Sequence, residues 1–312
     1  MAAFKNVGLD GYIKRYGLKY GILRGMFVGL PIHIIKDYEN RKLLYYYKAE
    51  CYIRKKYLKY AEKDPLEIKY IHADIRNPVW VYWGQKVENA PEIVKVCIKS
   101  MENHCENLII LDQQNVSEYI IFPSTINERL EKRKISSAAY SDLLRLSLLE
   151  HYGGTWLDAT VLLTDSIPNY VQESDFFAFR DQCGLMYNPA YICSWFLHSK
   201  PHHVAIREAR NILFAYWEHE NSLIEYLLVY IVLNLSIEKN SELIGIFPYA
   251  CSDYTRLMFN ALDKTYNPGL YQHITELSGI HKLTYKLTEE TLSNRDNLFH
   301  FLLSQRKNVN KD

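Results

Sequence analysis

Residues 136–164 read SSAAYSDLLRLSLLEHYGGTWLDATVLLT and predict a helix, a glycine turn and a strand. Ser136 or Ser137 can cap the start of the helix, and a run of leucines supplies its apolar side. The pair Gly153-Gly154 can adopt the positive φ that ends a helix. The residues that follow, up to Leu163, are mostly apolar, as in a strand covered on both faces. The stretch therefore predicts an α/β fold organised around a buried central strand.

Polar side chains interrupt this pattern at a few positions. Asp142 and Arg145 are three residues apart on the predicted helix and are therefore neighbours. Because side chains alternate along a strand, Trp156, Asp158 and Thr160 share one face of the predicted strand. A carboxylate there suits a metal-bound or sugar-bearing ligand beyond the carboxyl end of the strand. The pattern alone leaves a simpler interpretation open, in which Asp142 and Arg145 form a surface pair and Asp158 caps a loop.

The composition indicates one large domain, or one domain with an appendage, within 312 residues. Hydrophobic residues make up 48% and charged residues 23%, which is enough for a sizeable core and argues against global disorder. The six cysteines, Cys183 among them, form no C-x-x-C pair and no zinc spacing, so we interpret them as reduced thiols of a cytoplasmic protein. No signal peptide opens the chain, and the region after residue 70 carries no basic stripe that would indicate nucleic-acid binding.

The first 70 residues differ from the rest in charge. They hold 15 Lys and Arg against 7 Asp and Glu, and 11 tyrosines, whereas the remainder holds 22 against 29. They predict helices over 11–29 and 34–62, interrupted at Pro31, and no stretch among them is long and apolar enough to span a bilayer. A basic, aromatic, helical segment can lie on an anionic membrane surface. It can equally pack on the main domain, and the sequence leaves both possibilities open.

A second strand and its partner are predicted upstream. Residues 78–85 (PVWVYWGQ) form an apolar strand with Trp83 at its end, where ligands of an open α/β sheet gather, while Tyr82 faces the opposite side. A helix over 91–104 and a strand over 108–112 complete a βαβ unit, which favours a parallel sheet. Further strands are predicted over 175–180 and 191–197, and helices over 201–217 and 223–235.

The combination SDLLR, six residues, then YGG-x-W-x-DAT resembles the signature of the bacterial capsular polysaccharide synthesis proteins, relatives of glycosyltransferase family 32. The resemblance covers about residues 78–286. It implies a GT-A-type glycosyltransferase fold with a mostly parallel central sheet flanked by helices. Residues 1–70 would be a helical extension, and residues 71–312 a catalytic domain with a C-terminal segment that closes over the donor.

The resemblance also assigns roles to the polar residues of the central stretch. Asp142 and Arg145 would bind the donor sugar. Asp158 and Thr160 would hold the metal and the ribose, at the place of an Asp-x-Asp motif. Thr160 replaces the second carboxylate of that motif, and a hydroxyl is a weaker ligand for a hard divalent cation.

Other positions match the family more loosely. An aromatic at Trp83, or at Tyr82 as the fallback, would stack on the nucleotide base. Ser194 stands where relatives often have an asparagine near the sugar, and Glu225 matches an acidic residue that would face the reacting sugar or cap a helix.

His281 and Lys286 have the separation with which a related family holds the metal and the diphosphate. The glycine usual between these two residues is Leu283 here, so the match is partial. A neutral imidazole is a good ligand for a divalent metal, and a lysine is a good point charge for phosphate.

The function implied is retaining transfer of a hexose, galactose or glucose, from a UDP-sugar to a lipid-linked oligosaccharide at the inner face of the membrane, with Mn²⁺ or Mg²⁺. One alternative is a non-catalytic sugar-binding or assembly subunit, favoured by the missing second aspartate, because a fold alone does not give function. A metal-dependent hydrolase using Asp142, Asp158 and Asp165 is disfavoured, because no further cluster of carboxylates or histidines accompanies them.

Overall fold

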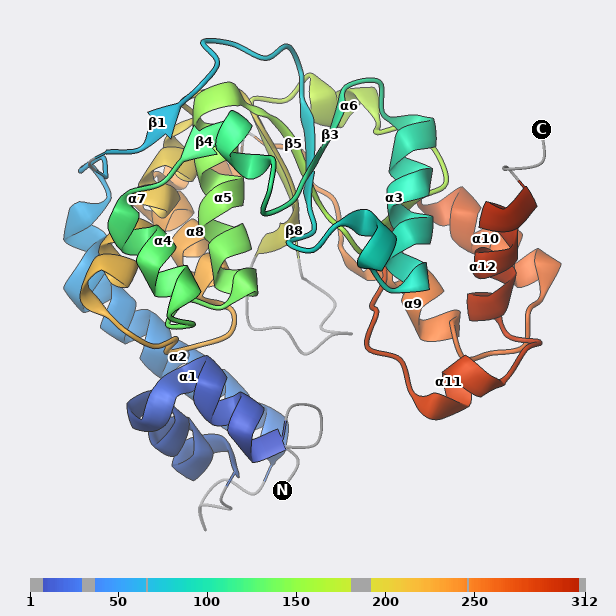
Figure 1. Ribbon diagram of the computed structural model, residues 1–312, viewed down its shortest axis with the longest axis horizontal. Coiled ribbons are helices and arrows are strands. Elements are labelled where there is room, and N and C mark those ends of the chain that lie inside the picture. The colour runs from blue at the N-terminus through green and yellow to red at the C-terminus, as the bar shows by residue number, and fades with distance from the viewer. Residues whose placement is uncertain (1–7, 30–36, 66, 181–191, 246, 309–312) are drawn as a thin grey trace.

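The structure, a computed structural model, describes residues 8–29, 37–65, 67–180, 192–245 and 247–308. Its centre is a five-stranded sheet in the order β3-β2-β5-β8-β7. Figure 1 shows α5, α7 and α8 on one side of this sheet and α3 on the other. The α/β class predicted from residues 136–164 is confirmed. Pro31, Cys183 and the predicted strand start at residue 191 lie outside the described residues.

The helices and strands have the following bounds. The α-helices are α1 (Gly8–Arg24), α2 (Tyr38–Tyr57), α3 (Glu92–His104), α4 (Ser124–Glu131), α5 (Ser137–Tyr152), α6 (Asn169–Gln172), α7 (Val204–His219), α8 (Leu228–Lys239), α9 (Leu257–Ala261), α10 (Pro268–Leu277), α11 (Glu289–Ser293) and α12 (Leu298–Asn308). The strands are β1 (Lys69–Tyr70), β2 (Val79–Tyr82), β3 (Leu108–Leu111), β4 (Ile120–Ile121), β5 (Gly154–Asp158), β6 (Val161–Leu163), β7 (Phe176–Arg180), β8 (Ile192–Ser199) and β9 (Ile280–Lys282).

The sheet is mixed rather than mostly parallel in its pairings. β2 pairs in parallel with β3 and β5, whereas β8 pairs antiparallel with both β5 and β7. Strands joined through a crossover helix, such as β2 and β3 through α3, run parallel. Among the described elements no helix lies between β7 and β8, and these two neighbours run antiparallel.

Two apolar cores lie on the two faces of the sheet. Trp80 and Trp156 belong to the core that α5, α7 and α8 cover, whereas Val81 and Leu157 belong to the core beneath α3 and α12. Because neighbouring residues of β2 and β5 point to opposite faces and each face carries a core, β2 is apolar throughout and the polar residues of β5 are Thr155 and Asp158. This is why the polar residues at the carboxyl end of β5 stand out.

The turn between α5 and β5 fixes where the site lies. Ser136 caps α5 and accepts a hydrogen bond from the Ala139 amide at 3.2 Å. Gly153 and Gly154 both have positive φ, and a Cβ on Gly154 would lie 2.1 Å from the Pro78 carbonyl oxygen. Only glycine allows so close a contact between β2 and the start of β5.

The predicted single strand up to Leu163 is wrong, because the chain turns at Ala159-Thr160. β5 ends at Asp158, and β6 continues after the turn to pair with β9 in a separate small sheet. Thr160 therefore lies in a turn and not on the face of β5. The pairing brings the C-terminal segment 280–282 to the end of the central strand.

The N-terminal helices share the core of the main domain. Tyr16 and Tyr20 of α1, and Ile53 and Tyr57 of α2, are buried in the same cluster as α7 and α8. The alternative that residues 1–70 pack on the domain is therefore observed for the described part. None of the described helices is both long and apolar enough to cross a bilayer.

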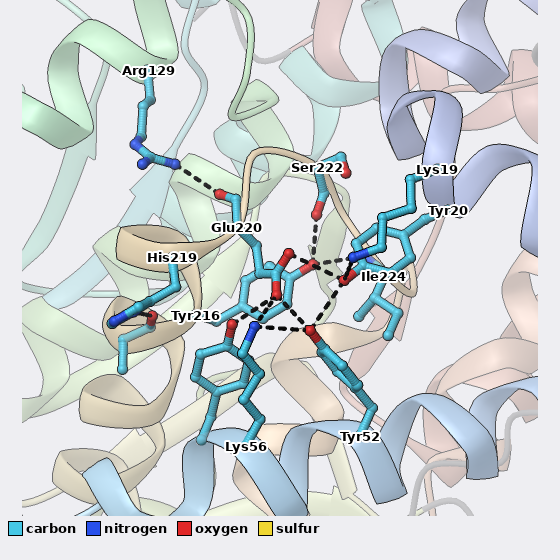
Figure 2. A network of polar contacts seen from close by, with 12 residues as sticks. Lys19, Tyr20, Tyr52, Lys56, Arg129, Tyr216, His219, Glu220, Ser222 and Ile224 are labelled. Carbon is cyan, nitrogen blue, oxygen red and sulfur yellow. Dashed lines mark hydrogen bonds and ion pairs between the residues drawn. The ribbon is translucent and has the colours of Figure 1, made fainter.

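A buried carboxylate connects these helices to the domain (Figure 2). Glu220 follows α7, and its carboxylate accepts hydrogen bonds from the hydroxyls of Tyr20, Tyr52 and Tyr57 at 2.6 to 3.1 Å. It also forms an ion pair with Lys56 at 2.7 Å. Burial opposes its ionisation, but Lys56 and the tyrosine hydroxyls lower its pKa to about 2. The charge is thus stabilised only while α1 and α2 stay docked.

Candidate active site

Arg145 of α5 connects three elements at the carboxyl end of β5. Its Nη2 lies 3.1 Å from a carboxylate oxygen of Asp142 and 3.1 Å from one of Asp158. Its Nη1 donates to the carbonyl and to the hydroxyl of Ser194 on β8, the latter at 2.9 Å. The guanidinium also lies over the Trp156 ring, 5.2 Å from the centroid. Arg145 is buried, so these contacts hold it in one position.

Four predicted residues are thus brought together: Asp142, Arg145, Asp158 and Ser194. Ser194 is buried and holds the arginine. The simpler interpretation of a surface pair does not fit, because the side chain of Arg145 is only 7% exposed and binds both carboxylates.

Lys282 joins these four residues, although the sequence did not predict it as a site residue. Its ammonium lies 2.7 Å from Asp158 Oδ2 and 2.7 Å from Thr160 Oγ1. Lys282 reaches them because β9 pairs with β6, with Val161 opposite Lys282. The only sequence signal was its place beside His281, and the pairing between segments over a hundred residues apart could not be predicted from local pattern.

The two carboxylates on Arg145 differ in ionisation. Burial raises the pKa of Asp142 to about 7, a neighbouring Asp158 adds to the rise, and Arg145 opposes it. Burial also acts on Asp158, but the charges of Lys282 and Arg145 outweigh it and lower the pKa of that carboxyl. At neutral pH the site therefore holds a firmly ionised Asp158 and an Asp142 close to its titration point.

Aromatic side chains lie at the end of β2. Trp83 is half-buried and meets the ring of Tyr285 edge-on, with centroids 5.5 Å apart. The Trp83 indole N–H has no hydrogen-bond partner among the described residues. Tyr82, the predicted fallback, is buried against Tyr140 and belongs to the core. Lys286 is exposed, with its ammonium 5.9 Å from the Tyr285 ring centroid.

Two predicted site residues lie apart from this group. Glu225 precedes α8 instead of lying on it, and its buried carboxylate pairs with Arg24 of α1. The imidazole of His281 is fully buried, with its Nε2 2.9 Å from the Thr164 hydroxyl. Because His281 and Lys282 are adjacent on β9, their side chains point to opposite faces, and only Lys282 faces Asp158.

The residues predicted to hold a divalent metal fit that role poorly. The Lys282 ammonium lies between Asp158 and Thr160, where the cation was predicted, and His281 is on the other face of β9. Within the described part of the chain, no three His, Cys, Asp or Glu side chains gather as a metal site would need. The geometry instead offers fixed cations, Arg145 and Lys282, around one carboxylate.

Comparison with known proteins gives two findings. Residues 31–302 match the sequence model of a family described as capsular polysaccharide synthesis protein. A solved structure titled PaToxG Glycosyltransferase is similar at 11% sequence identity and a TM-score of 0.38, over 76% of this chain and 95% of that chain. A TM-score this low carries no argument about fold or function. No curated protein matches the sequence.

Proposed function

The chain belongs to the capsular polysaccharide synthesis protein family, as residues 136–164 predicted, and from this premise we propose that it is a glycosyltransferase with a GT-A-type fold. The observation that carries the proposal is the pair of carboxylates, Asp142 and Asp158, held on one buried arginine at the carboxyl end of the central strand. Ligands of α/β sheets bind at this end of the strands.

The proposed reaction moves galactose or glucose from a UDP-sugar with retention of configuration. The bond between sugar C1 and the diphosphate oxygen breaks, and the acceptor oxygen bonds C1 from the same face. The acceptor proton passes to the departing diphosphate, so atoms and charge balance.

Three side chains of the site have a proposed task in this reaction: Asp142, Arg145 and Trp83. Asp142 accepts hydrogen bonds from sugar hydroxyls, and Arg145 orients it. Trp83 stacks on or donates to the base from the end of β2, where its N–H lacks a partner. The negative charge that develops on the diphosphate needs fixed cations close by.

The proposed acceptor is a lipid-linked oligosaccharide on the cytoplasmic face of the membrane. Support comes from the outer surface of α1 and α2. Leu18 and Ile22 of α1, and Leu44 and Tyr47 of α2, are exposed, and both helices carry more lysines and arginines than acidic residues. Apolar and basic side chains together suit an anionic lipid surface.

The test is UDP release from a panel of UDP-hexoses with an extracted lipid-linked acceptor. We expect turnover with UDP-galactose or UDP-glucose, and a loss of at least about a hundredfold in Asp142→Ala, since a charge-assisted contact to the sugar is removed. Asp165→Asn is the matched control, because Asp165 is exposed and outside the group. It also tests the hydrolase alternative.

Two results would count against the proposal. Binding of UDP-hexose without turnover would favour the non-catalytic sugar-binding or assembly subunit. Equal loss of activity in Asp165→Asn would favour a carboxylate site of a different kind.

A further inference from the structure

Lys282 occupies the position at which family resemblance predicts a divalent cation. Its Nζ is 2.7 Å from the Asp158 carboxylate and 2.7 Å from the Thr160 hydroxyl, the two side chains expected to bind the metal. The lysine side chain is only 13% exposed. A buried ammonium without partners would be unstable, and here both oxygens pair with it.

The backbone around Lys282 holds it there. β9 pairs antiparallel with β6, and the Leu283 amide donates to the Thr160 carbonyl at 2.8 Å. This bond connects the turn after Asp158 to the end of β9. The next residue back, His281, is buried on the opposite face and fixes the alternation.

Three cations, Arg145, Lys282 and Arg256, lie close to the two carboxylates of the site, Asp142 and Asp158. The Oδ1 atom of Asp158 pairs with Arg145 and its Oδ2 with Lys282, so a separate cation holds each oxygen. Arg256 is also close enough to disfavour the charge on Lys282. Such a surplus of fixed positive charge suits a ligand with two adjacent phosphates.

Thr160 explains why this arrangement suits a lysine. A second aspartate at this position would offer a divalent ion two carboxylates. A hydroxyl offers one neutral oxygen, which an ammonium can use as well as a metal can, because Lys has three donors and needs no fixed coordination number.

We propose that the Lys282 ammonium takes the place of the divalent cation and, with Arg145, neutralises the diphosphate of a nucleotide sugar, so that donor binding needs no metal. This rests on the proposed function, since it assigns a role to the same site. The ligand class is a nucleoside diphosphate.

The experiment measures UDP binding by isothermal titration calorimetry, in EDTA and in Mn²⁺. We expect the two dissociation constants of the wild-type protein to agree within about twofold. Lys282→Met should weaken binding by about tenfold to a hundredfold in both buffers, the usual effect of removing one charge-assisted contact. Lys282→Arg, which keeps the charge, should restore most of the affinity.

Lys264→Met is the matched control, because Lys264 is exposed and pairs only with Asp263 among the described contacts. Thermal unfolding of each variant shows whether it is folded. If Lys282→Met fails to fold, the comparison of EDTA with Mn²⁺ on the wild-type protein still tests whether donor binding needs a metal, and Lys282→Arg tests the role of the charge at this position.

The outcomes separate the two proposals. Binding that needs Mn²⁺ would overturn the role of Lys282 and leave the glycosyltransferase proposal standing. Binding in EDTA that Lys282→Met leaves unchanged would also overturn it. No UDP binding in either buffer would refute the proposed function, and this inference with it.

Discussion

Asp142→Asn tests the electrostatics of the site without the substrate. The side chain is 18% exposed, and burial raises its pKa from 3.8 to about 7 despite Arg145. Raising the pKa from 3.8 to about 7 corresponds to about 4 kcal/mol, because each tenfold change in the proton-binding constant is worth about 1.36 kcal/mol. Because water still reaches part of the side chain, we expect about 2 to 3 kcal/mol in practice. Asparagine has nearly the same shape and carries no charge.

The direction in which pH changes the stability follows from the linkage between proton binding and folding. A carboxyl whose folded pKa is raised binds its proton more tightly in the folded state, so its contribution to stability is present at low pH. That contribution is lost as pH rises from about 4 to about 7. Asp142→Asn should therefore stabilise the fold at pH 8, and the gain should shrink steadily toward pH 4.

The assay is urea unfolding of the variant and the wild-type protein at pH 5, 6, 7 and 8, read as the difference in unfolding free energy. Taking the difference cancels other titrating groups, such as buried His198 and His281, whose lowered pKa values act in the opposite direction. Asp158→Asn is the contrast, because it leaves Arg145 and Lys282 without their shared carboxylate. It should destabilise the fold by about 3 kcal/mol at pH 7. A difference for Asp142→Asn that is independent of pH would refute the reasoning.

Three further predictions concern other parts of the chain. Glu220→Gln should lower the unfolding free energy by about 2 kcal/mol at pH 7 and by less as pH falls from about 4.5 to about 2, measured by thermal unfolding; no loss at pH 7 would contradict the stabilising role of the network. Gly154→Ala should cost at least about 3 kcal/mol in urea unfolding, because its Cβ would meet the Pro78 carbonyl and its φ is +87°. The intact chain should sediment with anionic but not neutral liposomes and be released by salt; Leu18→Glu should weaken this binding, and sedimentation unaffected by lipid charge would contradict the membrane surface.

Local sequence predicted the part of the site that lies within one segment. Asp142 and Arg145 are neighbours because they are three apart on a helix, and Asp158 follows because a glycine turn leads directly into the strand. The packing of Trp80 in the core was also predictable from an apolar strand. These features depend on contacts between residues close in sequence, where periodicity is informative.

Features that depend on distant segments were not predictable. The strand stops at Asp158 because β6 turns away to pair with β9, and the polar residues in 155–163 do not by themselves identify that break. The carboxylate of Glu225 is taken by Arg24, which only the docking of α1 reveals. The mixed sheet likewise follows from the order of β7 and β8, whose strand patterns do not encode direction.

His281 and Lys282 show most clearly why local sequence could not identify the site residue on β9. A spacing motif compares residue types along the sequence, but within a strand each one-residue step changes the face on which a side chain lies. His281 matched the motif by type, yet its place opposite Leu162 directs it into the core, whereas Val161 opposite Lys282 directs the lysine to Asp158. Register therefore decides which of two adjacent residues can reach the ligand. An ammonium in place of an imidazole then changes the chemistry that the site can support, from coordination of a metal to direct binding of phosphate.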